Sequence, residues 1–198
     1  MPFTRLDPQF LLNAYARGEF PMADRHGVIR FYTADPRGII PLSPVEAFHV
    51  SGTLRQTIRQ GKFEVRIHHD FAGTMRACME ARRGRTWINE KLVAAYKGLH
   101  EIGHAHSVEA WHNGELAGGL YGVSLGAAFF GESMFHRKTD ASKIALVHLV
   151  ERLRERGFEL LDTQDTTAHL RRFGCIDIPA PEYLGRLENA LTKQRSFV

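Results

Sequence analysis

The sequence predicts a mixed α+β fold, in which a small N-terminal α+β domain (residues 1–61) precedes a larger domain (residues 62–198) with a mixed central sheet. Two observations carry this prediction. Residues 103–150 contain three apolar segments of strand length, joined by turn signals and followed by a helical pattern. Residues 62–102 hold one alternating segment and two segments with apolar residues at helical spacing. Helices and strands therefore mix along the chain and should pack on one another as layers.

Turn and capping residues delimit the elements of the N-terminal domain. A helix should begin at Asp7-Pro8, because Asp caps helices and Pro suits their first turn, and it should end at Gly18. The elements expected after it are a strand over 28–32, a turn over 35–38 that leads into a loop, a strand over 48–50, and a helix over 53–60.

The larger domain is dominated by a predicted three-stranded antiparallel unit. Asn113-Gly114 is a strong hairpin signal, because both residues tolerate positive φ. Three glycines in the strand that follows favour a bulge or a close approach of other groups to the backbone. The elements expected here are strands over 63–67, 104–111, 116–123, 127–134, 158–161 and 176–178, and helices over 70–82, 89–102, 140–156, 168–173 and 181–191.

Composition narrows the class of protein. Of 198 residues, 43% are hydrophobic and 24% are charged, which is enough apolar content for a core. No apolar run approaches a membrane span, the N-terminus has no signal-peptide pattern, and Cys78 and Cys175 lack metal-binding spacing. We therefore expect a cytoplasmic protein with free thiols and no membrane contact. A monomer is expected, because no apolar surface stripe stands out.

The chain is basic, with a net charge of +4 and a pI of about 9.3. A slightly basic enzyme is the simplest interpretation of this charge. Clusters of arginine raise the alternative of a polyanionic partner such as RNA, and they include Arg55 with Arg59 and the run Arg82, Arg83 and Arg85. His104 and His106 are spaced to share one face of a strand and could hold zinc, but no third ligand has a fixed spacing. No metal and no cofactor are therefore predicted.

The element order of the larger domain resembles that of the N-acetyltransferase (GNAT) fold, in which a central mixed sheet is splayed open to admit an acyl donor. GNAT enzymes that use coenzyme A have a glycine-rich loop that binds the pyrophosphate. The loop lies between the last strand of the three-stranded antiparallel unit and the helix that follows it. Here that segment is FHRKTDASK (residues 135–143), which contains no glycine. A GNAT-like sheet is therefore expected, and an acetyltransferase that uses coenzyme A is a weaker alternative.

Longer strings give a more specific resemblance. They are LLNAYARGEFP (11–21), TWIN (86–89), AYKGLHEIGH (95–104), GHAHSVEAW (103–111), GGLYGV (118–123), GESMF (131–135), DASKIAL (140–146) and LLDTQ (160–164). In this order they resemble the leucyl/phenylalanyl-tRNA–protein transferase family over nearly the whole chain. The resemblance implies transfer of Leu, Phe or sometimes Met from aminoacyl-tRNA to the N-terminal Arg or Lys of a protein, which marks that protein for degradation. A non-catalytic RNA-binding module is the third hypothesis.

Asp162 and Gln164 are the predicted catalytic residues. They lie two apart at the end of a predicted buried strand, so their side chains should share one face. The family has an Asp-x-Gln pair at this position, and whether Asp162 acts as a base, as an orienting anion or only as a turn residue stays open. We expect their replacement to slow turnover with little effect on the fold. The resemblance also implies that Glu132 anchors loop residues after Asp162, and that Thr167 stands where the family often has Asn.

The resemblance assigns two binding regions. The acyl side chain should enter an apolar pocket formed by Leu120, Phe129, Leu146, Leu149, Leu153 and Leu161. The alternative for these residues is ordinary core packing. Trp87 should stack on the adenine at the tRNA 3′ end, and Met22 stands where the family often has a second Trp. The tRNA body should contact Arg55 and Arg59 first, then Arg82, Arg83 and Arg85.

Overall fold

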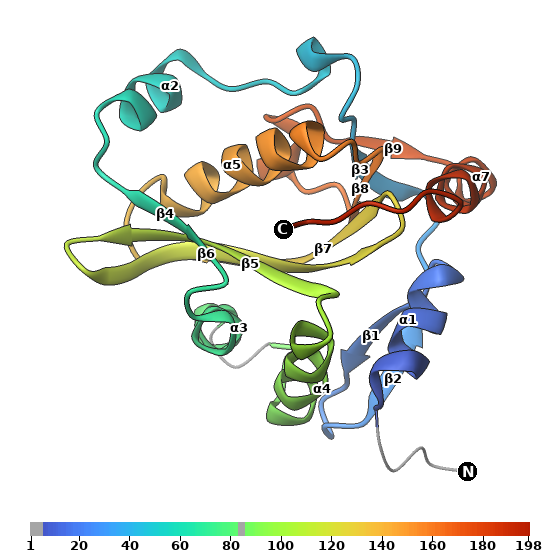
Figure 1. Ribbon diagram of the computed structural model, residues 1–198. Helices are drawn as coiled ribbons and strands as arrows, with labels where there is room; N and C mark the ends of the chain where they lie inside the picture. The colour runs from blue at the N-terminus through green and yellow to red at the C-terminus, as the bar shows by residue number, and fades with distance from the viewer. Residues whose placement is uncertain (1–5, 83–85) are drawn as a thin grey trace.

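The computed structural model describes residues 6–82 and 86–198, and within them its centre is a seven-stranded mixed sheet (Figure 1). The strand order is β4-β5-β6-β7-β8-β3-β9, and β7–β8 is the parallel pair among antiparallel neighbours. The strands are β3 (Arg37–Ile40), β4 (Glu64–Ile67), β5 (Ala105–His112), β6 (Glu115–Leu125), β7 (Ala128–His136), β8 (Leu160–Gln164) and β9 (Ile176–Ile178). A smaller sheet pairs β1 (Phe20–Ala23) with β2 (Ile29–Tyr32). The predicted mixed fold class is confirmed.

Helices cover both faces of the large sheet. Helix α5 (Ala141–Glu155) packs across β5, β6 and β7, while α3 (Phe71–Ala81) and α4 (Glu90–Glu101) lie against the opposite face (Figure 1). The other helices are α1 (Pro8–Ala16), α2 (Gly52–Arg59), α6 (Ala168–Arg171), α7 (Ala180–Leu191) and the 3-10 turn η1 (Val45–Ala47). Within the described residues, no helix combines the length and the apolar character that crossing a bilayer requires.

The helices begin where the capping residues predict. The side chains of Asp7, Ser51, Asp70 and Asn89 each accept a hydrogen bond from a backbone N–H in the first turn of their helix. Asp140 differs: its φ is 69°, it makes no capping bond, and its carboxylate accepts from Lys143 Nζ at 2.7 Å instead. The chain therefore enters α5 through a left-handed residue, which the sequence did not reveal.

The three-stranded unit β5-β6-β7 matches its prediction closely, including the hairpin at Asn113-Gly114, where both φ angles are positive. The expected irregularity is a bulge. Tyr121 pairs with Ser133 and Gly122 pairs with Gly131, which leaves Glu132 as the extra residue on β7. A Cβ at Gly122 would lie 2.4 Å from the Phe129 ring and 2.3 Å from the Phe130 carbonyl oxygen. This glycine therefore makes room for the neighbouring strand.

Two local predictions for the N-terminal segment are wrong. Residues 37–40, expected as the end of a turn and a loop, form β3 between β8 and β9. Residues 48–50, expected as a strand, follow the 3-10 turn η1 and pair with no strand of the described chain. Both errors have one cause: strand pairing is decided by partners that lie more than 100 residues away in the chain.

The insertion of β3 also bears on domain organisation. The sequence places a boundary at residue 61, and β3 precedes that point. Yet β3 hydrogen-bonds with β8 on one side and β9 on the other, so both segments contribute to the same sheet. The boundary at residue 61 stays a prediction, and the hydrogen bonds of β3 cross it.

The C-terminal tail closes one face of the sheet against buried histidines. Phe197 is 1% exposed, its ring stacks on His106 at a centroid distance of 4.3 Å, and its carbonyl accepts from Arg152 Nε. His106 Nδ1 lies 2.9 Å from His68 Nε2, and His106 Nε2 lies 2.7 Å from Ser124 Oγ. Burial, with positive neighbours second, lowers the pKa of His106 to about 3 and that of His68 to about 4.

These histidines should make the fold sensitive to acid. In the folded protein they stay neutral, whereas in the unfolded chain they bind protons below their ordinary pKa of 6.5. The contribution of these histidines to the free energy of unfolding should therefore be fully present above pH 6.5 and fall toward pH 4, by up to roughly 1.4 kcal/mol per pH unit for each histidine. Urea unfolding from pH 7.5 to pH 4 measures this dependence.

The matched comparison is His106→Gln against His49→Gln, because His49 is exposed. All other titrating groups are common to these proteins. The dependence of stability on pH should be weaker in His106→Gln and should keep the wild-type steepness in His49→Gln. Equal steepness in all three proteins would contradict the assignment.

Candidate active site

A cavity opens where the parallel strands β7 and β8 separate. The last residue pair in their register is Phe130 with Asp162, and beyond it the two strands diverge. The cavity has a volume of about 320 Å³ and is lined on one side by residues 131–134 and on the other by residues 163–165. The sheet is thus open where the resemblance to the GNAT fold predicts an acyl donor to enter.

Four of the six predicted pocket residues line this cavity, namely Leu120, Leu146, Leu149 and Leu161. Phe129 and Leu153 do not. Both are fully buried in the same apolar cluster, and the Phe129 ring packs on Phe197 at a centroid distance of 5.4 Å. In this structure these two side chains pack in the core, and their part in an acyl pocket stays a prediction.

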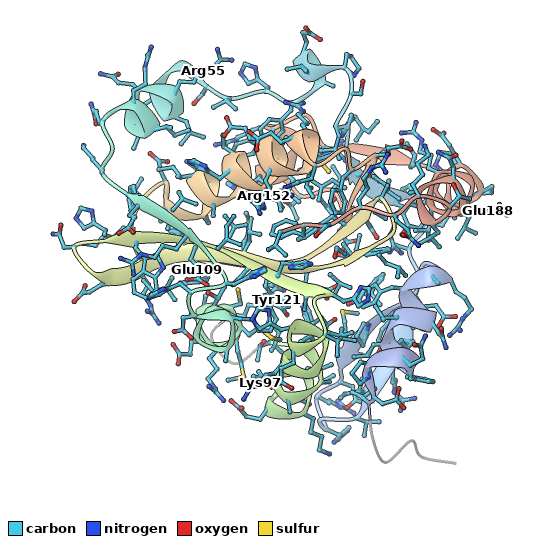
Figure 2. The ribbon with its side chains drawn as sticks, viewed as in Figure 1. Arg55, Lys97, Glu109, Tyr121, Arg152 and Glu188 are labelled. Atoms are coloured by element: carbon cyan, nitrogen blue, oxygen red, sulfur yellow. The ribbon has the colours of Figure 1, made fainter. Side chains whose placement is uncertain are left out.

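The cavity wall also contains apolar residues that the sequence did not single out: Phe20, Tyr121, Met134 and Leu170. Tyr121 projects from β6 toward α3 and α4 (Figure 2), where its ring meets Phe71 and Tyr96 edge-on. Its hydroxyl is buried and has no hydrogen-bond partner within the described residues. Phe20 on β1 and Leu170 on α6 come from opposite ends of the chain, so no spacing in the sequence could have linked them.

Glu132, the bulged residue of β7, lies in the cavity wall with 8% of its surface exposed. Tyr15 donates a hydrogen bond to Glu132 Oε1 (2.7 Å) and Tyr96 donates one to Oε2 (3.1 Å). Burial raises the pKa of Glu132 to about 7, although the two tyrosine hydrogen bonds oppose the shift. Glu132 thus ties α1 and α4 to the sheet.

The predicted contact of Glu132 with the loop after Asp162 is therefore wrong: within the described residues its hydrogen bonds come from the two tyrosines. The bulge turns its side chain toward the helices that carry them. Thr167, its expected companion, lines the cavity, and its hydroxyl accepts from Leu170 N at 3.2 Å to cap α6. A buried carboxylate needs donors, and a buried Tyr needs an acceptor, so this pairing could have been suspected from the sequence.

Asp162 forms a buried ion pair behind the cavity wall. Arg37 Nε donates to Oδ1 (2.9 Å) and Nη2 donates to Oδ2 (2.7 Å), and the two side chains are 1% and 0% exposed. Tyr183 also donates to Oδ2, at 2.8 Å. Burial alone would lower the pKa of Arg37, but the hydrogen bonds and charge of Asp162 outweigh burial and raise it. Both carboxylate oxygens of Asp162 thereby accept hydrogen bonds.

Gln164 does line the cavity, so the two residues do not share one face as the spacing predicted. Gln164 has a φ of 58°, which turns the chain at the end of β8. Its backbone N–H donates to Asp162 Oδ1 at 2.9 Å, so the buried ion pair fixes this turn. The side-chain Nε2 is buried and has no hydrogen-bond partner within the described residues. Its two N–H bonds are thus unpaired in this structure.

Arg37 and Tyr183 are the functional residues that sequence reasoning missed. Arg37 comes from β3 and Tyr183 from α7, so they approach Asp162 from distant parts of the chain. The Arg37 guanidinium also donates to the Gly18 carbonyl oxygen and lies over the Tyr183 ring. The one sequence signal was Ile39-Ile40, a β-branched pair that favours a strand after Arg37.

Trp87 and Met22 both line the cavity, as expected of residues that hold one ligand together. The backbone links their segments, because Ala23 N donates to the Trp87 carbonyl oxygen at 3.0 Å. Arg82 lines the same cavity, and its guanidinium lies 5.9 Å from the centre of the Trp87 ring. The ring of Trp87, the thioether of Met22 and the guanidinium of Arg82 thus belong to residues that line the same cavity.

Of the predicted basic residues, Arg55 and Arg59 are exposed on α2, which packs on the outer side of α5 (Figure 2). Arg83 and Arg85 lie outside the described residues. His104 and His106 are held by hydrogen bonds to the Ser124 carbonyl oxygen and hydroxyl. Within residues 6–82 and 86–198, no group of three or more His, Cys, Asp or Glu side chains could hold a metal ion.

Comparison with known proteins identifies the family of this chain. The sequence model of the leucyl/phenylalanyl-tRNA protein transferase family matches residues 42–188, and the model of that family's N-terminal domain matches residues 4–35. A curated leucyl/phenylalanyl-tRNA–protein transferase of Rubrobacter xylanophilus is 53% identical over 194 residues, covering 98% of this chain and 99% of the relative. One of Paramagnetospirillum magneticum is 54% identical over 196 residues, covering 97% and 92%.

Among solved structures, L-PGS from Bacillus licheniformis aligns with 76% of this chain and 47% of its own, at 15% identity and a TM-score of 0.44. That likeness is too weak to add to the assignment, which rests on the sequence relatives. Identity above 50% over nearly the full length of both chains leaves one conclusion. This chain is a member of the leucyl/phenylalanyl-tRNA–protein transferase family.

Proposed function

We propose that this protein transfers Leu, Phe or Met from aminoacyl-tRNA to the N-terminal Arg or Lys of acceptor proteins, which marks them for N-degron-dependent degradation in the cytoplasm. Family membership makes the chain an aminoacyltransferase that moves an aminoacyl group from tRNA to protein. The observation that carries the finer proposal is the unpartnered amide of Gln164 at the wall of an apolar cavity. We take the monomer as the active form.

The reaction is the aminolysis of an activated ester. The acceptor α-amine attacks the ester carbonyl, the new N–C bond forms, and the C–O bond to the tRNA ribose breaks. The amine loses one proton and the ribose oxygen gains one, so no other reactant is consumed. With an amine pKa of about 7.7–8.0, roughly one acceptor in ten is already free base at pH 7. A strong base therefore adds little, whereas orientation can contribute about 7–11 kcal/mol.

Gln164 suits the orienting role. Its free Nε2–H groups would donate to the ester carbonyl oxygen and follow it as negative charge develops, as donors of an oxyanion hole do. Asp162 would act as the anion that holds Gln164 in place, because its two oxygens already accept from Arg37, Tyr183 and the Gln164 backbone. Of the roles that the sequence left open for Asp162, these contacts support that of an orienting anion.

The cavity fits the proposed acyl groups. Its leucine side chains come from β6, α5, β8 and α6, and Met134 adds a flexible apolar surface. Such a wall accepts unbranched or γ-branched side chains such as Leu, Phe and Met. A β-branched side chain would fit less well close to the ester, although an apolar pocket discriminates single methyl groups by only about 10–200-fold. Trp87 and Met22 would hold the 3′ adenine at the opening, where stacking contributes about 1–3 kcal/mol per base.

The exposed arginines of α2 should contribute to tRNA binding through phosphates. Each phosphate contact adds about −0.9 to the slope of log affinity against log salt concentration. The double variant Arg55→Ala/Arg59→Ala should therefore raise the KM for aminoacyl-tRNA and reduce the magnitude of that slope by about 2. The measurement is kcat/KM for aminoacyl-tRNA at several potassium chloride concentrations.

The control is Lys97→Ala/Arg186→Ala, which removes the same charge from exposed sites on α4 and α7. It should keep the wild-type slope. If both double variants had the same slope, net charge rather than this surface would govern binding, and α2 would be excluded from the interface.

One experiment tests the proposed function. The protein is incubated with Leu-tRNA or Phe-tRNA and a peptide that begins with Arg or Lys, and in parallel with acetyl-CoA and the same peptide. We expect transfer of Leu or Phe to the peptide α-amine and no acetylation. Acetylation alone would support a coenzyme A-dependent enzyme, and tRNA binding without transfer would support an RNA-binding module. A peptide with an acetylated N-terminus is the control for the site of transfer.

A further inference from the structure

Three charged side chains line the cavity, within the part of the chain that the structure describes: Arg82, Glu132 and Asp165. The two carboxylates differ sharply in their surroundings. Glu132 is buried and engaged by Tyr15 and Tyr96. Asp165 is exposed, and its carboxylate makes no hydrogen bond or ion pair with any described residue. Asp165 is therefore a lining residue whose carboxylate has no partner among the described residues.

The backbone of Asp165 is nevertheless firmly placed. Its N–H donates to the Thr163 carbonyl oxygen at 2.7 Å, and Thr163 Oγ1 donates to its carbonyl oxygen at 3.3 Å. It also passes directly over β3, because a Cβ at Gly38 would lie 2.6 Å from the Asp165 carbonyl carbon. Only glycine permits that approach. The backbone of Asp165 is thus held in place, while its carboxylate has no partner among the described residues.

The charge of Asp165 does not suit the tRNA. A carboxylate at the wall of a site that receives a polyanion repels phosphates, and in a partly enclosed site this repulsion is stronger than in water. The other substrate is a protein N-terminus, which brings a cation. Asp165 directly follows Gln164, the residue proposed to hold the ester, and both line the same cavity. When the α-amine of the acceptor attacks the ester, the side chain of that first acceptor residue would therefore lie close to Asp165.

We propose that Asp165 is the specificity residue that pairs with the guanidinium of Arg or the ammonium of Lys at the first position of the acceptor. This inference rests on the proposed function, because it concerns the acceptor of that reaction. A carboxylate can receive the guanidinium through two parallel hydrogen bonds and the ammonium through one. Asp165 thereby selects a cationic acceptor and takes no part in the chemical step.

The test compares peptides that begin with Arg and with citrulline, which has the shape of Arg without its charge. With Leu-tRNA as donor, the wild-type protein should favour the Arg peptide by about tenfold in kcat/KM, the scale of one charge-assisted hydrogen bond. In Asp165→Asn this preference should fall to near unity, through a higher KM for the Arg peptide. The KM for Leu-tRNA should not rise.

The matched control is Glu188→Gln, which removes an exposed carboxylate on α7 (Figure 2) that does not line the cavity. It should keep the tenfold preference. A wild-type preference that survives in Asp165→Asn, or an absent preference in the wild type, would overturn the role of Asp165 while transfer itself continued. If the wild type transferred no amino acid to any peptide, the proposed function would fail instead. The two failures are thus distinguishable.

Discussion

Replacing Gln164 with alanine should lower kcat for aminoacyl transfer by about 10²–10³-fold, the usual effect of removing one oxyanion-hole donor. The Gln164 side chain is placed at the cavity wall by a backbone turn with a φ of 58°, and its Nε2 has no partner among the described residues. A donor held ready in this way serves the developing negative charge of the transition state more than the neutral ester. The loss should therefore appear in kcat, with the KM for Leu-tRNA little changed.

The same substitution should not destabilise the protein. A buried donor without a partner costs about 1–3 kcal/mol, and alanine removes that cost together with the amide. Thermal unfolding of Gln164→Ala should thus occur at or above the wild-type temperature. Gln194→Ala, on the exposed C-terminal tail, is the control for loss of an amide elsewhere. Wild-type turnover in Gln164→Ala would exclude Gln164 from the reaction.

Replacing Asp162 with alanine should reduce the free energy of unfolding by about 3–5 kcal/mol, because it leaves the Arg37 guanidinium buried without its counter-ion. From the sequence alone, this substitution is expected to affect turnover with little effect on the fold. The ion pair revises that expectation: both side chains are almost wholly inaccessible to solvent, and Arg37 lies on β3, which pairs with β8 on one side and β9 on the other. Arg37→Ala should be comparably destabilising.

A double variant separates the ion pair from other effects. Arg37→Met/Asp162→Leu replaces both charges with apolar groups, and such replacements are often close to neutral. It should lose less stability in guanidinium unfolding than the two single alanine variants added together. It should still transfer poorly, because the Gln164 backbone N–H has lost its acceptor. If the single losses simply added, the ion pair would not be their source.

The sequence could predict the elements that depend on neighbouring residues, but not those that depend on partners far away in the chain. The strands β5 to β7 and the helix α5 were predictable, because alternation, the Asn113-Gly114 turn and helical spacing act within a few residues. The four leucines that line the cavity were assigned from the resemblance to the family instead. The strand β3 was not predictable, since its partners lie near the other end of the chain. The resemblance to the family placed Phe129 and Leu153 in the pocket, and periodicity could not separate them from core residues, because a core side chain and a pocket side chain have the same spacing.

The polar half of the site was harder to predict for a related reason. Asp162 and Gln164 stood out in one short string, but their supports did not. Arg37 and Tyr183 reach Asp162 only through the tertiary fold, and Tyr15 and Tyr96 reach Glu132 from two different helices. Asp165 was not singled out from the sequence. Its proposed role depends on its carboxylate having no ion-pair partner in the fold, and a sequence does not show which partners a side chain has.

The position of β3 between β8 and β9 has a consequence for how the protein is made. A strand near the start of the chain must wait for partners at residues 161–164 and 176–178. Such contacts raise the contact order of the fold, and closing so long a loop costs entropy before any pairing repays it. A ribosome therefore has to release most of the chain before Arg37 can meet Asp162. We expect that a nascent fragment ending at residue 170, which contains Gln164 but lacks β9 and Tyr183, does not assemble the Gln164 turn.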